Sequence, residues 1–252
     1  MSPRTQQGLR FAGRTALVTG GNAGIGLAIS QALLKQGARV IAAGLAPAET
    51  AHPLLTSVVT DLSTSDGVAA LVAAVALEPR IDILVNNAGV VRNTALADVG
   101  NAEFDLMMNL HARCAMQLAQ ACLPRMQARH FGRIVNVASR AIVGLAGRTA
   151  YGASKAALAA MTRTWALELG PWGITVNTVS PGPTVTGMLT SDFPEDSERA
   201  RALAASLPAR RLGLPEDVAH AALFFADPAS SWITGQNLFV CGGGSLAASL
   251  AL

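Results

Sequence analysis

Short apolar segments alternate with helical segments from the first glycine-rich turn of the chain onward. Residues 15–19 form an apolar run that leads into glycines, and residues 25–36 then follow helical spacing up to Gly37, a residue type that often ends helices. Further apolar runs occupy residues 39–43, 57–61, 81–86, 133–138, 174–180 and 238–240. Strands that alternate with helices in this way predict an α/β fold, in which a doubly wound parallel sheet of about seven strands carries helices on both faces.

The remaining helical patterns connect these runs and leave one irregular segment. They cover residues 66–77, 102–126, 151–169 and 215–226. The chain of 252 residues shows no linker, and its 51% hydrophobic and 14% charged residues fit a sheet that is buried on both faces. We therefore expect a single domain over residues 1–252. The irregular segment, residues 183–212, follows a strand end, where a lid over a site would lie.

Charge and cysteine usage argue against several classes of protein. The net charge is +3 and the basic residues are scattered, so we expect neither nucleic acid nor a membrane as a partner. The longest apolar run, residues 68–77, is too short to span a bilayer, and residues 1–10 lack the apolar stretch of a secretory signal. The three cysteines and four histidines lack disulfide or metal-ligand spacing. These features predict a cytoplasmic protein without a catalytic metal.

Tyr151 and Lys155 are the most informative pair of side chains. Residues four apart share one face of a helix, so the phenol and the ammonium face the same space. A nearby cation stabilises a phenolate and lowers a pKa that is otherwise about 10, and we expect Lys155 to act in this way on Tyr151. Ser139 lies twelve residues before Tyr151 in the sequence. Alternatively, the pair lies on the surface and Ser139 only ends a strand.

The glycine-rich turn predicts a phosphate site. Gly20, Asn22, Gly24, Ile25 and Gly26 lie where the first strand meets the first helix. Glycines permit positive φ and let backbone N–H groups approach a pyrophosphate at the positive end of a helix. Next to an acid–base pair, such a turn favours a dinucleotide-dependent reaction over a plain loop.

In order and spacing, these motifs resemble the short-chain dehydrogenase/reductase family over essentially the whole chain. The matching positions are Gly20, Gly24, Gly26, Asp61, Leu62, residues 86–89, Asn109, Ser139, Tyr151, Lys155, Pro181, Gly182 and Thr186. The resemblance implies a Rossmann-type domain and an NAD(P)-dependent oxidoreductase that interconverts a secondary alcohol and a ketone. Tyr151 would exchange a proton with the substrate while hydride passes between the substrate carbon and the nicotinamide.

The resemblance also implies roles for individual residues. Asp61 and the amide of Leu62 would bind the adenine, unless Asp61 only caps a helix. Asn109 would distort its long helix and hold a water that links Lys155 to solvent, unless it is an ordinary buried residue. The remaining cofactor contacts would come from Asn86, Ala88 and Gly89 near the adenosine ribose, from Tyr151 and Lys155, and from Pro181, Gly182, Thr184 and Thr186 near the carboxamide. For Asn87, an ordinary hydrogen-bonding role is the expectation.

Cofactor and substrate preferences rest on fewer residues. Residues 42–45 carry no charge where relatives place either an acid for the ribose or an arginine for a 2′-phosphate, which argues for NAD over NADP. Arg92, Arg140 and Arg148 would favour a polar or acidic substrate, unless they are ordinary surface residues. The lid residues Met188, Leu189, Phe193 and Leu203 would instead favour an apolar substrate or pack the lid itself.

Assembly and an alternative function complete the expectations. In relatives, the helices that correspond to residues 102–126 and 151–169 pack against copies of themselves, so we expect a homotetramer, with a dimer as the alternative. The alternative function is a nucleotide-sensing binding protein that has kept the fold and lost turnover. The presence of Ser139, Tyr151, Lys155 and Asn109 argues against it.

Overall fold

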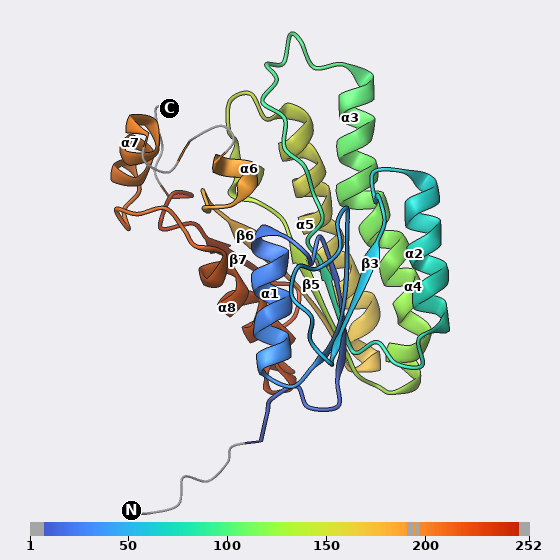
Figure 1. Ribbon diagram of the computed structural model, residues 1–252. Helices are drawn as coiled ribbons and strands as arrows, with labels where there is room; N and C mark the ends of the chain where they lie inside the picture. Colours follow the sequence, from blue (N-terminus) through green and yellow to red (C-terminus); the bar gives the residue numbers. More distant parts are fainter. Residues whose placement is uncertain (1–7, 191–193, 195–196, 247–252) are drawn as a thin grey trace, which may run out of the picture.

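A seven-stranded, entirely parallel sheet forms the centre of the protein. The computed structural model describes residues 8–190, 194 and 197–246. The strands are β1 (Thr15–Thr19), β2 (Arg39–Gly44), β3 (Leu55–Val59), β4 (Ile83–Asn86), β5 (Gly132–Val137), β6 (Ile174–Pro181) and β7 (Asn237–Val240). Their order in the sheet is β3-β2-β1-β4-β5-β6-β7 (Figure 1). The chain therefore winds outward from β1 in both directions, which confirms the predicted doubly wound, Rossmann-type fold.

Helices cover both faces of this sheet. The longer helices are α1 (Gly24–Lys35), α2 (Ser65–Leu77), α3 (Asn101–Met108), α4 (Cys114–Ala128), α5 (Thr149–Leu169), α7 (Glu198–Ser206) and α8 (Pro215–Ala226), and α6 (Gly187–Thr190) is a single turn. In Figure 1, α1 and α8 lie on one side of the sheet and α2, α4 and α5 on the other. Alternation along a strand separates the two cores: Ala16 and Val18 pack with α1 and α8, while Leu17 packs with α2 and α4.

One expected helix is not continuous. The pattern over residues 102–126 predicts a single helix, but the structure has α3, then a π-helical turn over Asn109–Arg113, and then α4. A π-turn holds one more residue than an α-turn and often lies at a functional site. The strand expected over residues 57–61 also lies earlier, at β3. Within the expected lid, α6 and α7 are helices that the irregular pattern does not predict.

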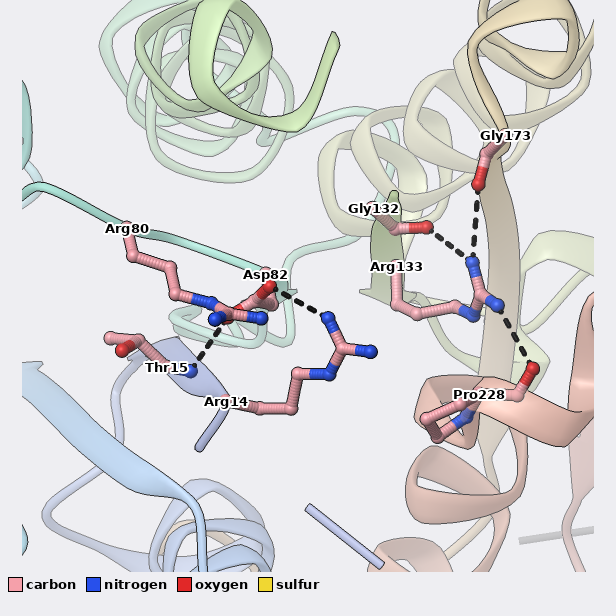
Figure 2. Close-up of polar contacts among 8 residues, drawn as sticks. All are labelled: Arg14, Thr15, Arg80, Asp82, Gly132, Arg133, Gly173 and Pro228. Carbon is pink, nitrogen blue, oxygen red and sulfur yellow. Dashed lines mark hydrogen bonds and ion pairs between the residues drawn. The ribbon is translucent and has the colours of Figure 1, made fainter. Parts of the chain in front are cut away.

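A polar cluster joins the strands at their amino ends, and Figure 2 shows its two halves. The fully buried carboxylate of Asp82 accepts hydrogen bonds from the backbone N–H of Thr15 at 2.9 Å and from the guanidinium of Arg14 at 3.2 Å, and it forms an ion pair with Arg80. Buried Arg133 donates to the carbonyl of Gly132 at 2.8 Å, next to it in β5, and to the carbonyls of Gly173 and Pro228 in two other segments at 3.3 and 3.1 Å. Burial lowers the pKa of Arg133 to about 10.

The Phe131 ring lies between the two halves of this cluster. The guanidinium carbons of Arg14 and Arg133 are 3.9 and 4.3 Å from the centre of the ring. Such contacts attract a cation to an aromatic face. The cluster thus ties β1, β4, β5 and β6 together at the edge where these strands begin. Among the described residues, no helix is both long and apolar enough to cross a membrane.

Candidate active site

The predicted site residues gather at the opposite edge, where the strands end. In a parallel sheet, all carboxyl ends meet at one edge, and ligands bind there beside the point where the strand order reverses. Here that point lies between β1 and β4. The glycine turn follows β1, Asn86 ends β4, Ser139 follows β5 by two residues, and Pro181 ends β6.

The glycine turn has the geometry of a backbone cradle. Gly20 and Gly24 have φ angles of +63° and +49°, which favour glycine. A Cβ at Gly26 would lie 2.0 Å from the carbonyl oxygen of Gly20, so no larger residue fits there. The turn opens into the start of α1, where unpaired N–H groups and the helix dipole favour an anion. These features fit the pyrophosphate of a dinucleotide.

The segment after β4 supports this turn. The Asn87 amide donates to the carbonyl of Thr19 at 2.9 Å, and the Thr19 hydroxyl accepts from the N–H groups of Asn87 and Ala88 at 2.9 and 3.0 Å. Asn87 thus has the ordinary hydrogen-bonding role expected of it. Asn86 is buried and donates to Asn136 on β5 at 2.8 Å, which joins the two strand ends.

The loop after β6 lies against the glycine turn. Thr186 approaches the turn so closely that a Cβ at Gly24 would lie 3.3 Å from its methyl group. Gly182 donates its N–H to Val240 on β7 at 2.9 Å, and a Cβ there would lie 2.7 Å from Cys241. Thr184 is buried, and its hydroxyl donates to the carbonyl of Gly182 at 3.1 Å. The turn after β1 and the loop after β6, which are far apart in the sequence, therefore lie side by side at this end of the sheet.

Asp61 and Leu62 lie at the outer part of this edge, just beyond β3. The Asp61 carboxylate accepts from the N–H of Ser63 at 2.9 Å, and the hydrogen bond to Ser63 lowers its pKa. Asp61 is exposed and is not the capping residue of α2, because Thr64 holds that position. Leu62 turns its side chain into the core. Binding of adenine by this pair remains a prediction.

Tyr151 and Lys155 lie in the first two turns of α5, on one face as expected. The Ser139 hydroxyl accepts a hydrogen bond from the N–H of Ala141 at 3.1 Å, and it lies close enough to the Tyr151 phenol to act on the pKa of that phenol. The buried Lys155 ammonium donates to the carbonyl of Val137, at the end of β5, at 2.8 Å. Helix and sheet thus bring Ser139, Tyr151 and Lys155 to one place.

The charges of this site differ from the sequence expectation. Burial raises the pKa of Tyr151, whereas the nearby Ser139 hydroxyl and the charge of Arg148 act in the opposite direction. Burial also lowers the pKa of Lys155 to about 7. The sequence predicts that Lys155 lowers the pKa of Tyr151. In the structure this pKa is raised, because burial has the largest effect, so the prediction of a lowered value is wrong. The i and i+4 spacing gives a shared face, but it does not reveal that the ammonium binds a strand carbonyl and is buried.

Asn109 begins the π-turn that separates α3 from α4. Its side-chain carbonyl accepts a hydrogen bond from Arg113, four residues later. The helix is therefore distorted where the family resemblance implies distortion. The same turn carries Leu110, His111 and Ala112 into buried positions.

His111 is a site residue that the sequence patterns do not predict. Its Nε2 atom accepts from the N–H of Val90 at 3.1 Å, so the proton of the neutral ring lies on Nδ1, which donates to the Ser154 hydroxyl at 2.8 Å. Ser154 in turn donates to the carbonyl of Tyr151 at 2.8 Å. Burial, followed by the charge of Lys155, lowers the pKa of His111 to about 2. The only sequence signal is its position two residues after Asn109.

The ring of His111 also contacts α5 directly. It stands edge-on to the ring of Tyr151, with the ring centres 5.6 Å apart and an interplanar angle of 88°. A Cβ at Gly89 would lie 2.8 Å from His111 Nε2 and 3.3 Å from Lys155 Nζ. Gly89 is thus packed against both side chains. This explains why the strand end needs glycine here.

The three arginines that could border the pocket lie in different surroundings. Arg148 places its guanidinium carbon 5.8 Å from the centre of the Tyr151 ring. Arg140 is buried, donates to the carbonyl of Gly244 at 3.3 Å, and has a pKa lowered by burial. Arg92 is exposed. Of the lid residues, Leu203 is buried and Leu189 is half-buried, while Phe193 and the Met188 side chain lie outside the described part of the chain.

A phenol, a hydroxyl and a buried amine beside a phosphate cradle can perform proton transfer on a substrate held between them. The described residues contain no group of three or more His, Cys, Asp or Glu side chains that could hold a metal ion. Cys114 and Cys122 are buried, and burial raises the pKa of each thiol to about 12. Both thiols pack in the hydrophobic core beneath α4.

Comparison with known families and proteins gives matches over nearly the whole chain. The family model described as Enoyl-(Acyl carrier protein) reductase matches residues 20–245. A (2S)-[(R)-hydroxy(phenyl)methyl]succinyl-CoA dehydrogenase subunit of Thauera aromatica is 38% identical, over 92% of this chain and 97% of that one. A 3-oxoacyl-[acyl-carrier-protein] reductase of Rickettsia bellii is 36% identical, over the same shares of the two chains.

Solved structures give the same picture. A short chain dehydrogenase/reductase family protein is 39% identical with a TM-score of 0.86, covering 94% of this chain and all of its own. A structure described as an NAD(P) dependent gluconate 5-dehydrogenase from Beutenbergia cavernae, with bound NADP, is 34% identical with a TM-score of 0.88, covering 95% of this chain and all of its own.

Proposed function

The chain belongs to the short-chain dehydrogenase/reductase family and is an NAD(P)-dependent oxidoreductase, and we propose that it interconverts a secondary alcohol and a ketone with Tyr151 as the general acid and base. The observation that carries this proposal is the meeting of Tyr151 with Ser139 and Lys155 at the strand edge that also holds the glycine turn. The names of the relatives support the reaction class, because a 3-oxoacyl reductase and a hydroxyacyl dehydrogenase both act between a carbinol and a carbonyl carbon.

The side chains of the site have separate roles in the proposed reaction. In alcohol oxidation, Ser139 holds the substrate oxygen and the Tyr151 phenolate accepts the hydroxyl proton, while the carbinol hydride leaves carbon. The bound dinucleotide supplies the hydride acceptor. In the reverse direction, the neutral phenol returns the proton to the oxygen. Lys155 would bind the ribose of the nicotinamide half, and Asn109 would maintain the distorted helix near it.

The glycine turn and the loop after β6 would hold the dinucleotide. Gly20, Asn22, Gly24, Ile25 and Gly26 would contact the pyrophosphate through backbone N–H groups, as the positive φ angles and the close approach at Gly26 allow. The other contacts would come from Asp61, Leu62, Asn86, Ala88 and Gly89 on the adenosine side, and from Pro181, Gly182, Thr184 and Thr186 on the nicotinamide side.

Replacing Tyr151 by Phe tests the proton-transfer role. Because general acid–base catalysis contributes about 10²- to 10⁴-fold, we expect turnover to fall by at least about a hundredfold while dinucleotide affinity stays nearly unchanged. The assay follows reduced nicotinamide with secondary alcohols and ketones, including gluconate and a 3-oxoacyl thioester, which the names of the relatives suggest. Thermal unfolding of the variant is the control for folding. Turnover by the variant at the wild-type rate contradicts the role of Tyr151. A wild-type protein that binds the dinucleotide but turns over none of these substrates favours a nucleotide-sensing protein instead.

For the cofactor, NAD remains our proposal over NADP, on grounds of charge. Residues 40–79, which include the ends of β2 and β3, contain no lysine or arginine, whereas a 2′-phosphate carries nearly two negative charges and prefers arginine. The comparisons do not support this preference, since one similar structure has NADP bound. The proposed preference for NAD therefore rests on the absence of lysine and arginine from residues 40–79.

A direct comparison of affinities decides between the two cofactors. We expect NAD to bind at least about tenfold more tightly than NADP, measured by calorimetry on the wild-type protein. Leu45 is exposed directly after β2, so Leu45→Arg should narrow the difference by offering a cation to the phosphate. Tighter binding of NADP by the wild type would overturn the preference and leave the proposed reaction intact.

A further inference from the structure

Arg148 stands at the start of the catalytic helix and faces the phenol. It is the residue immediately before α5, and its guanidinium carbon is 5.8 Å from the centre of the Tyr151 ring. At this distance a cation is attracted to an aromatic ring. The guanidinium is charged at every pH that proteins tolerate. A permanent positive charge therefore lies beside the group that exchanges the proton.

The loop after β4 fixes this arginine. Its Nη1 atom donates to the carbonyl of Arg92 at 3.4 Å. A backbone bridge joins Thr94 to Arg148, with the N–H of Thr94 bonded to the carbonyl of Gly147 at 3.0 Å. The guanidinium is half-buried rather than free in solvent, so water screens its charge only in part.

Arg148 and Lys155 differ in how they can act on the phenol. Residues 148, 151 and 155 share one helix face, because spacings of three and four residues bring side chains together. The Lys155 ammonium, however, is bonded to Val137, and burial lowers its pKa to about 7, so its charge is only partly present near neutral pH. The charge of Arg148 persists, and it lowers the pKa of Tyr151 against the effect of burial.

We propose that Arg148 is a positioning residue of the active site, whose guanidinium stabilises the phenolate of Tyr151 from the open end of the helix. The inference rests on the proposed function, in which Tyr151 must lose and regain a proton. Arg148 thereby favours the phenolate that alcohol oxidation requires, independently of the protonation of Lys155.

Other ionisable groups near this face have different partners. His111 on the π-turn is neutral, since its pKa is lowered to about 2. Glu103 on α3 accepts from the Thr94 hydroxyl at 2.8 Å, and buried Arg140 donates to Gly244. Asp105 on α3 is exposed. Arg148 is thus the persistent charge in ring contact with Tyr151.

The chain contains one tyrosine, so the phenol can be titrated without background. Growth on difluorotyrosine places the label at residue 151 alone, and its fluorine NMR shift then reports phenol ionisation at a lower pH than natural tyrosine allows. We expect Arg148→Gln to raise this pKa by roughly 0.5 to 2 units, as a charge about 6 Å away in a partly hydrated site should. Arg148→Lys should retain most of the wild-type value. Arg163→Gln, an exposed charge change on the same helix, should leave the pKa unchanged.

Two results would overturn the proposal. One is a change in the pKa of Tyr151 in Arg148→Gln that is no larger than the change in Arg163→Gln. The other is an equal shift in Arg148→Gln and Arg148→Lys, which would mean that the shape of the arginine, rather than its charge, matters. If Arg148→Gln fails to fold, as judged by circular dichroism, the pKa in Arg148→Lys decides: a value raised by 0.5 units or more contradicts the charge role. The titration needs no substrate, so a failure of the proposed reaction would leave its result standing.

Discussion

Lys155 is a buried residue whose charge changes near neutral pH. Its ordinary pKa is 10.5, and burial lowers it to about 7 in the folded protein. Between these two values the unfolded chain binds the extra proton and the folded protein does not. Folding in this pH range releases the proton of Lys155, so raising the pH favours the folded state. The free energy of unfolding therefore increases with pH across this window.

Lys155→Met removes this dependence. From pH 7 towards pH 10, the free energy of unfolding of the wild type should increase relative to that of the variant by about 1.4 kcal/mol per pH unit, the slope of one proton. Below pH 7 the difference should level off. Urea unfolding at a series of pH values measures both. Lys35→Met changes the chain's other lysine, which is exposed, and retains Lys155, so its free energy of unfolding should show the same pH dependence as that of the wild type. A parallel pH dependence in wild type and Lys155→Met would contradict the burial of the charge.

At the scale of residues, the sequence predicts side chains that share an element better than contacts between elements. Tyr151 and Lys155 lie on one face because helix geometry requires it. The contact of His111 with Tyr151 depends on the π-turn packing against α5, and the bond from Lys155 to Val137 depends on how α5 lies over β5. Neither relation has a local sequence signal. Both decide the pKa values of the site.

At the scale of elements, the polar cluster at the start of the strands is a stabilising feature that apolar patterns cannot reveal. Asp82 is fully buried and its carboxylate bonds the backbone of β1 as well as two arginines, while its own carbonyl accepts from the N–H of Arg133 at 2.9 Å. Removing one member of a buried charged group leaves its partners uncompensated. Arg14 and Arg80 are each about one-quarter to one-third exposed, so water can compensate them in part.

Asp82→Asn should therefore lower the free energy of unfolding by about 3 kcal/mol, at the lower end of the usual cost for a broken buried pair. Chemical denaturation at neutral pH provides the measurement. Asp98→Asn, which alters an exposed carboxylate, is the control and should change stability by less than about 0.5 kcal/mol. Equal stabilities of the two variants would show that the cluster contributes little. Dinucleotide affinity should be unaffected, because Asp82 lies at the far edge of the sheet.

The sequence predicts regular elements well and irregular ones poorly. The helix over residues 215–226 coincides with α8, and the strand over residues 15–19 coincides with β1, because strong periodicity and clear boundaries mark both. The apolar pattern alone does not reveal the π-turn at Asn109–Arg113, since one additional residue hardly disturbs such a pattern; only the family resemblance implies a distortion at Asn109. Helices α6 and α7 escape prediction because Pro and Gly interrupt their surroundings.

At the scale of the whole molecule, assembly into a homotetramer remains a prediction. Helix α5 carries small residues on its outer side, including Gly152, Ala153, Ala156 and exposed Ala160. Small residues allow two helices to approach closely, and a symmetric pair of such faces would form an isologous contact.

Light scattering tests this assembly. The native mass should be four times the chain mass of 25.8 kDa, and Ala160→Arg should reduce it by placing a bulky charge between paired helices. Ala73→Arg makes the same change at an exposed position on α2 and should leave the mass unchanged. A native mass of one chain would refute the prediction. A mass of two chains would support the dimer instead.

The two ends of the strands have different roles. Asp82 and Arg133 hold the strands where they begin, while Tyr151, Lys155 and the glycine turn lie where they end. Loops that follow the carboxyl ends of the strands, such as the described parts of residues 183–212, could therefore be replaced by the corresponding loops of relatives that act on other alcohols. The rest of the fold should tolerate such replacements, because the contacts of Asp82 and Arg133 lie far from the replaced loops.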